Sequence, residues 1–227
     1  MTTGFDYSNL SGRPPGRFVR IASAVLPGVR AVQAQIVPYA QAWRAHNLAA
    51  LAADGPLWVA LGDSMTQGIG AGAYDRGYVG QLAATQPFRV VNLGFSGALV
   101  GDVLERQLPA MAALGAAPAL VTLLIGSNDA MSAQARERLA HDFPRLLAAL
   151  PPGTVVGTMP APHATARAIN RMIDEAAGPR GLVLAEFRDP RMRQWRGKLA
   201  ADLFHPNDLG YAGMAGVFAE ALARRPR

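Results

Sequence analysis

The stretch LWVALGDSMTQG (57–68) joins a short, continuously apolar run to a serine flanked by glycines. The apolar part, 57–61, is typical of a strand buried on both faces. Four similar runs follow, separated by segments in which apolar residues recur at helical spacing: RVVNL (89–93), LVTLLI (120–125), TVVGTM (154–159) and LVLAEF (182–187). This alternation predicts an α/β fold, a three-layer α/β/α sandwich with a doubly wound, mainly parallel five-stranded sheet.

The composition fits a packed, folded protein. Of the 227 residues, 50% are hydrophobic and 17% are charged, and there is no cysteine. Disulfides and cysteine-ligated metal sites are therefore excluded. The net charge of +6 favours anionic partners, but every basic residue except Lys198 is arginine and no basic stretch alternates with aromatic residues. We therefore expect no nucleic-acid partner.

The first 56 residues differ from the rest, and we expect an irregular arm and a helical extension in front of a main domain over 57–227. The apolar run 21–29 is too short, and too interrupted by proline, for a signal peptide, so a cytoplasmic location is expected, with a secreted or membrane-associated one as the alternative. Helical spacing over 29–51 predicts a helix that Pro38 kinks or divides. This helix either packs on the main domain or, as a basic amphipathic segment, touches a membrane or closes over a substrate site.

Residues with groups that can take part in catalysis follow several of the expected strands, at the sheet edge where doubly wound folds bind ligands. Ser64 follows the first strand on a glycine-flanked turn, Gly94 follows the second, and Asn128 follows the third. Asp202 and His205 lie three residues apart before the last expected helix. Together they supply a nucleophile, a base, a group that orients the base, and donors for an oxyanion.

In these residues the chain resembles the GDSL, or SGNH, hydrolase family. Four blocks occur in order: GDSMTQG around Ser64, NLG at Gly94, GSND at Asn128, and DLFHP at Asp202 and His205. The resemblance spans roughly 57–225 and implies a flavodoxin-like sheet.

Carried over to this chain, the family pattern makes Ser64 the nucleophile, His205 the general base and Asp202 the residue that orients it. The Ser64 and Gly94 amides and the Asn128 side chain would form the oxyanion hole. The implied activity is hydrolysis of a small-molecule carboxylic ester through an acyl-serine, without metal or cofactor. The four histidines also show no spacing typical of metal ligands: His46, His141, His163 and His205.

Three other interpretations remain open. The segment GFSGA (94–98) imitates the nucleophile elbow of α/β-hydrolases with Ser96 as nucleophile, although Ala98 stands where that elbow has glycine. An acyltransferase on the same fold would deliver the acyl group to a sugar or lipid hydroxyl. An inactive member of the fold would only bind carbohydrate or lipid.

Two segments are candidates for substrate contacts. The basic segment RDPRMRQWRGK (188–198) either attracts anionic substrates or is a solvated loop. The segment MPAPHA (159–164), which contains His163, is predicted to line the substrate pocket, with Trp195 and Met192 opposite it.

Overall fold

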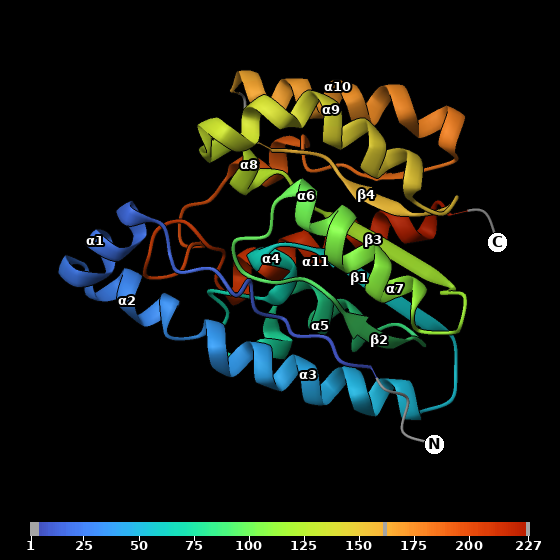
Figure 1. Ribbon diagram of the computed structural model, residues 1–227, viewed down its shortest axis with the longest axis horizontal. Helices are drawn as coiled ribbons and strands as arrows, with labels where there is room; N and C mark the ends of the chain where they lie inside the picture. The colour runs from blue at the N-terminus through green and yellow to red at the C-terminus, as the bar shows by residue number, and fades with distance from the viewer. Residues whose placement is uncertain (1–4, 161–162, 226–227) are drawn as a thin grey trace.

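The computed structural model describes residues 5–160 and 163–225. Its centre is a five-stranded sheet in the order β2-β1-β3-β4-β5, in which every pair of neighbours is parallel (Figure 1). The strands are β1 (Leu57–Gly62), β2 (Arg89–Asn92), β3 (Leu120–Leu124), β4 (Val155–Gly157) and β5 (Val183–Ala185). All five coincide with the apolar runs of the sequence, so the predicted sheet is confirmed.

Helices cover both faces of this sheet. One face carries α6 (Val100–Asp102), the π-helical turn η2 (Val103–Gln107), α7 (Leu108–Ala112), α9 (Ala133–Ala149) and α10 (Ala164–Arg180). The other face carries α5 (Tyr78–Ala83) and α11 (Asp208–Ala223). The shorter elements lie in the loops: α4 (Ser64–Gln67), η1 (Tyr74–Arg76), α8 (Ser127–Met131) and η3 (Pro190–Arg193).

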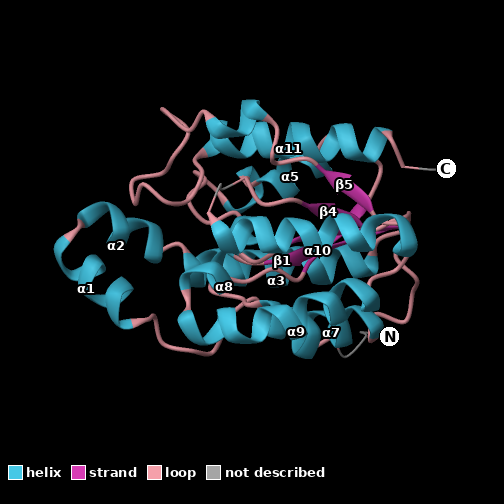
Figure 2. Cartoon of the chain, turned by 90° about the horizontal axis from the view of Figure 1, so that it is seen from above, coloured by secondary structure: helices cyan, strands magenta, loops and turns pink. Residues whose placement is uncertain are grey.

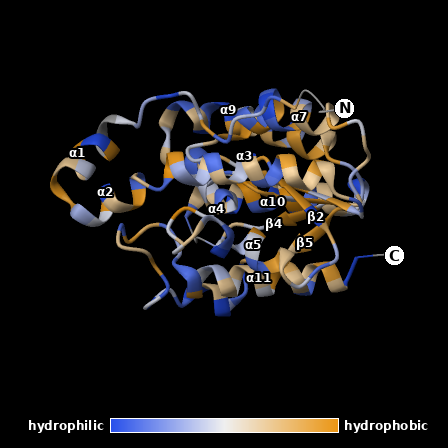
Figure 3. Cartoon of the chain, turned by 90° about the horizontal axis from the view of Figure 1, so that it is seen from below, coloured by the Kyte–Doolittle hydropathy of each residue, from blue (hydrophilic) through white to orange (hydrophobic). Residues whose placement is uncertain are grey.

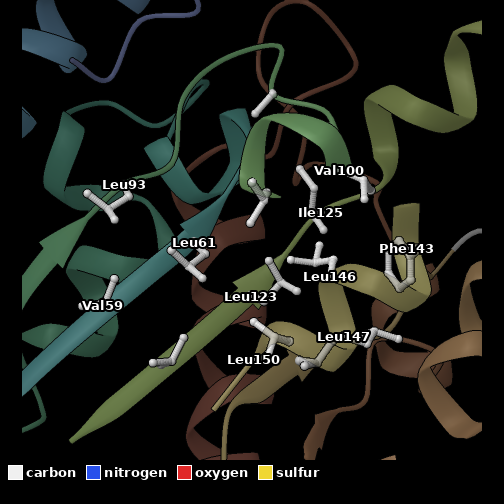
Figure 4. Close-up of a cluster of buried hydrophobic side chains, with 14 of the residues drawn as sticks. Val59, Leu61, Leu93, Val100, Leu123, Ile125, Phe143, Leu146, Leu147 and Leu150 are labelled. Atoms are coloured by element: carbon white, nitrogen blue, oxygen red, sulfur yellow. The ribbon is translucent and has the colours of Figure 1, made fainter. Parts of the chain in front are cut away.

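The core consists of two apolar layers, one on each face of the sheet. Successive residues of β1 alternate between them: Val59 and Leu61 pack in the first layer, and Trp58 and Ala60 in the second. Figure 4 shows Leu61 of the first layer beside Leu123 of β3, together with side chains of α9. Because both faces are covered, the strands are mostly apolar rather than alternating between apolar and polar residues, which is the pattern that the sequence shows. Apolar colour accordingly gathers on the strands in Figure 3.

The described part of the N-terminal region, residues 5–56, contains three helices, α1 (Arg17–Val25), α2 (Pro27–Gln33) and α3 (Ile36–Ala52). The segment 29–51 is divided as expected, but the break lies before Ile36 rather than at Pro38. Pro38 stands in the first turn of α3, where its missing N–H needs no partner. Among the described helices, none has both the length and the apolar character needed to cross a membrane.

Helix α3 covers the open edge of the sheet at β2. The Asn47 side chain of α3 accepts a hydrogen bond from the Asn92 N–H and donates one to the Asn92 carbonyl, both at 2.8 Å. The Trp43 ring of the same helix is buried and donates to the Gln67 carbonyl. A side chain therefore satisfies backbone groups that a neighbouring strand would otherwise pair.

Gln107 fixes the end of β1, just before the serine of the GDSM block. Its side-chain oxygen accepts from the Gly62 N–H and its amide donates to the Gly62 carbonyl, both at 2.8 Å, and the side chain is fully buried. The N–H and the carbonyl of Gly62 therefore both find their hydrogen-bond partner in this one side chain.

We expect Gln107→Met to lower the free energy of unfolding by about 2–5 kcal/mol, because it leaves two buried backbone groups without partners. Urea unfolding followed by circular dichroism measures the loss. Gln41→Met, the same change at an exposed position of α3, is the control and should change stability little. Equal stability of the two variants would show that Gly62 does not need the Gln107 side chain.

Candidate active site

Ser64 lies on a sharp turn at the carboxyl end of β1. The turn begins at Gly62, whose φ is +151°, and a Cβ there would come within 2.2 Å of Thr66 Oγ1. Asp63 then caps α4 by accepting a hydrogen bond from the Met65 N–H at 2.9 Å. Ser64 is consequently the first residue of α4, so its own N–H has no helical partner.

His205 and Asp202 reach Ser64 from the loop before α11. His205 Nε2 is 2.9 Å from Ser64 Oγ, and His205 Nδ1 is 2.6 Å from Asp202 Oδ2. The other Asp202 oxygen accepts from the N–H groups of Phe204 and His205 at 3.1 and 3.0 Å. Ser64 is only 4% exposed and His205 only 6%. The three residues that the sequence singled out for catalysis therefore lie in one hydrogen-bonded chain.

The charge on Asp202 sets the tautomer of His205. Burial raises the pKa of Asp202, but the hydrogen bond and charge of His205, with the two backbone donors, together hold that pKa below its usual value. An ionised carboxylate only accepts hydrogen bonds, so Nδ1 carries the proton that it donates to Asp202. Nε2 is then free to accept from the Ser64 hydroxyl.

Donors for an oxyanion gather at the same place. Asn128 donates one amide hydrogen to the Ala98 carbonyl at 2.9 Å, which leaves its second amide hydrogen available. Asn128, Ser64 and His205 line one cavity, as do Ser96 and Gly97.

The structure corrects the prediction for Gly94. Its N–H donates to Asn92 Oδ1 at 2.8 Å, so it is not available to an oxyanion, and Gly94 does not line the cavity. The loop after β2 passes Gly94 close to Thr66 and reaches the cavity two residues later, at Ser96 and Gly97. There Gly97 has φ +77°, and its N–H makes no hydrogen bond with any described residue. Of the two glycines, Gly97 rather than Gly94 therefore has an N–H without a partner among the described residues and lies at the cavity.

The structure does not bring the predicted substrate contacts His163 and Trp195 to the cavity of Ser64, because neither residue lines it. His163 is exposed and caps α10, where its Nδ1 accepts from the Ala166 N–H. Trp195 is partly buried and packs on the core layer that contains Met192. Of the segment 159–164, positions 161–162 lie outside the described residues.

The basic segment 188–198 also lies away from the cavity. Arg188 pairs with Glu186 and Asp174, and Arg191 pairs with Asp189 and Glu220. These arginines neutralise neighbouring carboxylates, which supports the interpretation as a solvated loop.

Ser96, the rival nucleophile, has no hydrogen-bonded base among the residues that the structure describes. Its side chain lies at the cavity, and its N–H donates to Gln67 Oε1 at 2.7 Å, but His205 points to Ser64 instead. Within the described parts of the chain, no three His, Asp or Glu side chains form a group that could hold a metal ion.

The N-terminal arm contributes contacts that the sequence analysis missed. Tyr7 donates through its hydroxyl to the Leu93 carbonyl, and Asn9 donates to the carbonyls of Asn92 and Gly94. Further along, the Arg13 side chain contacts the loop at the edge of the cavity.

Arg13 donates to the Gly97 carbonyl at 3.0 Å and forms a two-point ion pair with Asp102. The arm therefore supports the loop that carries Gly97. No motif marks these residues, because an irregular segment gives no periodic signal.

The layered fold and the Ser-His-Asp chain at the sheet edge define a hydrolase of the three-layer α/β/α class. The chain belongs to the GDSL-like Lipase/Acylhydrolase family, whose model matches residues 60–212. That confirms the resemblance seen in the sequence, and the protein is a carboxylic ester hydrolase. A search of curated protein sequences finds no match to this chain.

Solved structures share the fold at low sequence identity. LAE5, an alpha/beta hydrolase enzyme from the metagenome of Lake Arreo in Spain, is 23% identical, with 75% of this chain and 96% of that chain covered and a TM-score of 0.58. TesA is 24% identical, with 73% and 97% covered and a TM-score of 0.59. Axe2, an acetylxylan esterase from Geobacillus stearothermophilus, is 21% identical, with 74% and 94% covered and a TM-score of 0.56.

Asp63, beside the serine, generates a prediction about stability and pH. Burial raises the pKa of Asp63 from 3.8 to about 6, against the opposing effects of the Met65 N–H and the charge of His205. Since the pKa is higher in the folded state than in the unfolded state, the folded protein loses stability as the pH rises from about 4 to 6.

We expect Asp63→Asn to raise the free energy of unfolding at pH 8 by about 2–3 kcal/mol, and by much less near pH 4, because the amide carries no charge but still accepts from Met65. Urea unfolding at the two pH values measures the difference. Asp54→Asn, at an exposed position, is the control. If Asp63→Asn raised the free energy of unfolding equally at both pH values, the raised pKa of Asp63 would be contradicted.

Proposed function

We propose that this protein hydrolyses carboxylic esters through an acyl-serine intermediate on Ser64. The observation that carries the proposal is the hydrogen-bonded chain from Ser64 Oγ to His205 Nε2, at 2.9 Å, and from His205 Nδ1 to Asp202, at 2.6 Å. A serine hydroxyl needs a base within hydrogen-bond distance to act as a nucleophile, and this arrangement provides one.

In the first half of the reaction, Ser64 Oγ attacks the ester carbonyl carbon while His205 Nε2 takes the hydroxyl proton. The carbonyl oxygen becomes an oxyanion, and the N–H groups of Ser64 and Gly97 and the free amide hydrogen of Asn128 donate to it. The tetrahedral intermediate collapses, the C–O bond to the alcohol breaks, and His205 gives its proton to the leaving alkoxide.

In the second half, a water molecule attacks the acyl-serine as His205 takes one of its protons. The same three donors stabilise the second oxyanion. Collapse of the intermediate breaks the bond to Ser64 Oγ, His205 returns the proton to that oxygen, and the carboxylic acid leaves. Asp202 stays ionised throughout and holds the imidazole in place.

The proposal is tested with purified protein and p-nitrophenyl esters of several acyl chain lengths. Ser64→Ala and His205→Ala should each lower kcat by at least about 10³-fold, since each removes one part of the nucleophile–base pair. Ser96→Ala is the control and should keep most of the activity. Turnover that survives Ser64→Ala but not Ser96→Ala would move the nucleophile to Ser96.

The products show which acceptor receives the acyl group. With glycerol added, free acid as the main product supports hydrolysis. A glyceryl ester as the main product would instead identify an acyltransferase that uses the same acyl-serine.

Asn128→Ala provides a separate test of the oxyanion hole. We expect kcat to fall by about 10²–10³-fold with a small change in KM, because the lost donor acts mainly on the transition state. Steady-state kinetics measures the split, and the thermal midpoint serves as the folding control. A rise in KM at unchanged kcat would show that Asn128 only binds the substrate.

A further inference from the structure

The helices α1 and α2 form a hairpin (residues 17–33) that lies to one side of the layered body (Figure 2). It lies outside the part of the chain that matches the family model, which begins at residue 60. The solved structures named above leave about a quarter of this chain uncovered although they are themselves matched almost completely. The hairpin is thus an addition to the shared catalytic core.

Polar contacts fix the hairpin at both ends. Before it, Arg13 is held by Asp102 and the Gly97 carbonyl. After it, Gln35 accepts from the Gly70 N–H at 2.8 Å and donates to the Ala71 carbonyl at 3.1 Å. The hairpin therefore has a defined position next to the catalytic residues.

The middle of the hairpin contacts the loop that carries Asp202 and His205. Gly28 approaches this loop so closely that a Cβ on Gly28 would lie 2.1 Å from the Ala201 oxygen. Only a residue without a side chain allows this approach. The hairpin therefore lies directly against the catalytic loop, and residues of both segments line one cavity.

This cavity has a volume of about 1110 Å³ and reaches Ser64 and His205. Pockets for drug-sized ligands measure about 300–1,000 Å³, so the cavity is far larger than an acetyl group requires. The side formed by α1, α2 and the start of α3 is mostly apolar: Val19, Ala22, Val29, Ile36 and Val37. The side formed by α9 is mixed, since the polar side chains of Gln134, Arg138 and Asp142 line the cavity together with the apolar Ala135 and Leu139.

We propose that the apolar side of this cavity, formed by the hairpin and the start of α3, binds the acyl chain of the substrate, and that the substrate is an ester of an aliphatic acid of about eight carbons or more with a polar alcohol. The proposal rests on the proposed function, because it places the ester carbonyl at Ser64. A mostly apolar side, with Gln33 as its polar member, and an opposite side that carries charged and amide groups match a molecule with an aliphatic chain and a polar group. Each methylene removed from water favours binding by up to about fourfold.

The first experiment compares kcat/KM for p-nitrophenyl acetate and octanoate, both kept as monomers in solution. We expect octanoate to exceed acetate by at least about tenfold in the unaltered protein, since six more methylenes contact the apolar wall. Equal values, or a preference for acetate, would overturn the proposal.

Two matched variants test the wall itself. Val19 lines the cavity and Val25 does not, and both lie on α1 with 37% and 69% of their surface exposed. Val19→Asp should remove most of the preference for octanoate, because kcat/KM for octanoate falls by a much larger factor than kcat/KM for acetate. Val25→Asp should leave both unchanged.

Loss of both activities in Val19→Asp, or an effect of the same size in Val25→Asp, would overturn the proposal. Val29→Trp, which fills the cavity from α2 without adding charge, is the second variant and should give the same loss of octanoate preference.

A binding measurement separates this inference from the proposed function. The Ser64→Ala protein is titrated with cis-parinaric acid, a fluorescent long-chain fatty acid, and the bound probe is displaced with octanoic acid. Saturable binding that Val19→Asp weakens at least about tenfold supports the acyl site, even if Ser64→Ala keeps its esterase activity and the mechanism fails. Absence of saturable binding overturns the acyl site, even if Ser64 is the nucleophile.

Discussion

The turn at Gly62 is the constraint on which the rest of the site depends. Both backbone polar groups of Gly62 are held by Gln107, and a Cβ at this position would meet Thr66 Oγ1 and the Leu124 carbonyl at 2.2 and 2.3 Å. The chain therefore leaves β1 in one direction only and places Ser64 at the start of α4. Since parallel strands all end at the same edge, the loops after β2 and β3 bring Gly97 and Asn128 to the same place.

The sequence predicted what local signals encode. Each strand is a short apolar run, and each catalytic block lies directly after a strand or before the last helix, so the fold and the Ser64–His205–Asp202 chain follow from patterns within a few residues. Gly94 shows the limit of this reasoning. The segment 92–97 contains two glycines, and only the path of the loop decides which N–H reaches the cavity and which pairs with Asn92.

The missed residues share a different property, namely that their partners lie far away along the chain. Arg13 contacts Asp102 and Gly97, and Tyr7 contacts the Leu93 carbonyl, over separations of more than eighty residues. Nothing in the arm distinguishes these side chains from those of a solvated segment. His163 and Trp195 were singled out by their place along the chain, but His163 caps α10 and Trp195 packs on the core, so neither lies at the cavity.

The arm and the hairpin contact two loops that reach Ser64, namely the loop that carries Gly97 and the loop that carries Asp202 and His205. Through Arg13 the segment before the hairpin holds the Gly97 loop, and through Gly28 the hairpin rests on the loop of Asp202 and His205. Asp102 keeps only 11% of its side-chain surface exposed, so losing Arg13 would leave a nearly buried carboxylate without its charge partner. The segments that line the cavity on this side therefore also contact the loop of Gly97 and the loop of Asp202 and His205. The N-terminal extension therefore lines the same cavity as Ser64 and His205, although the family model begins only at residue 60, within β1.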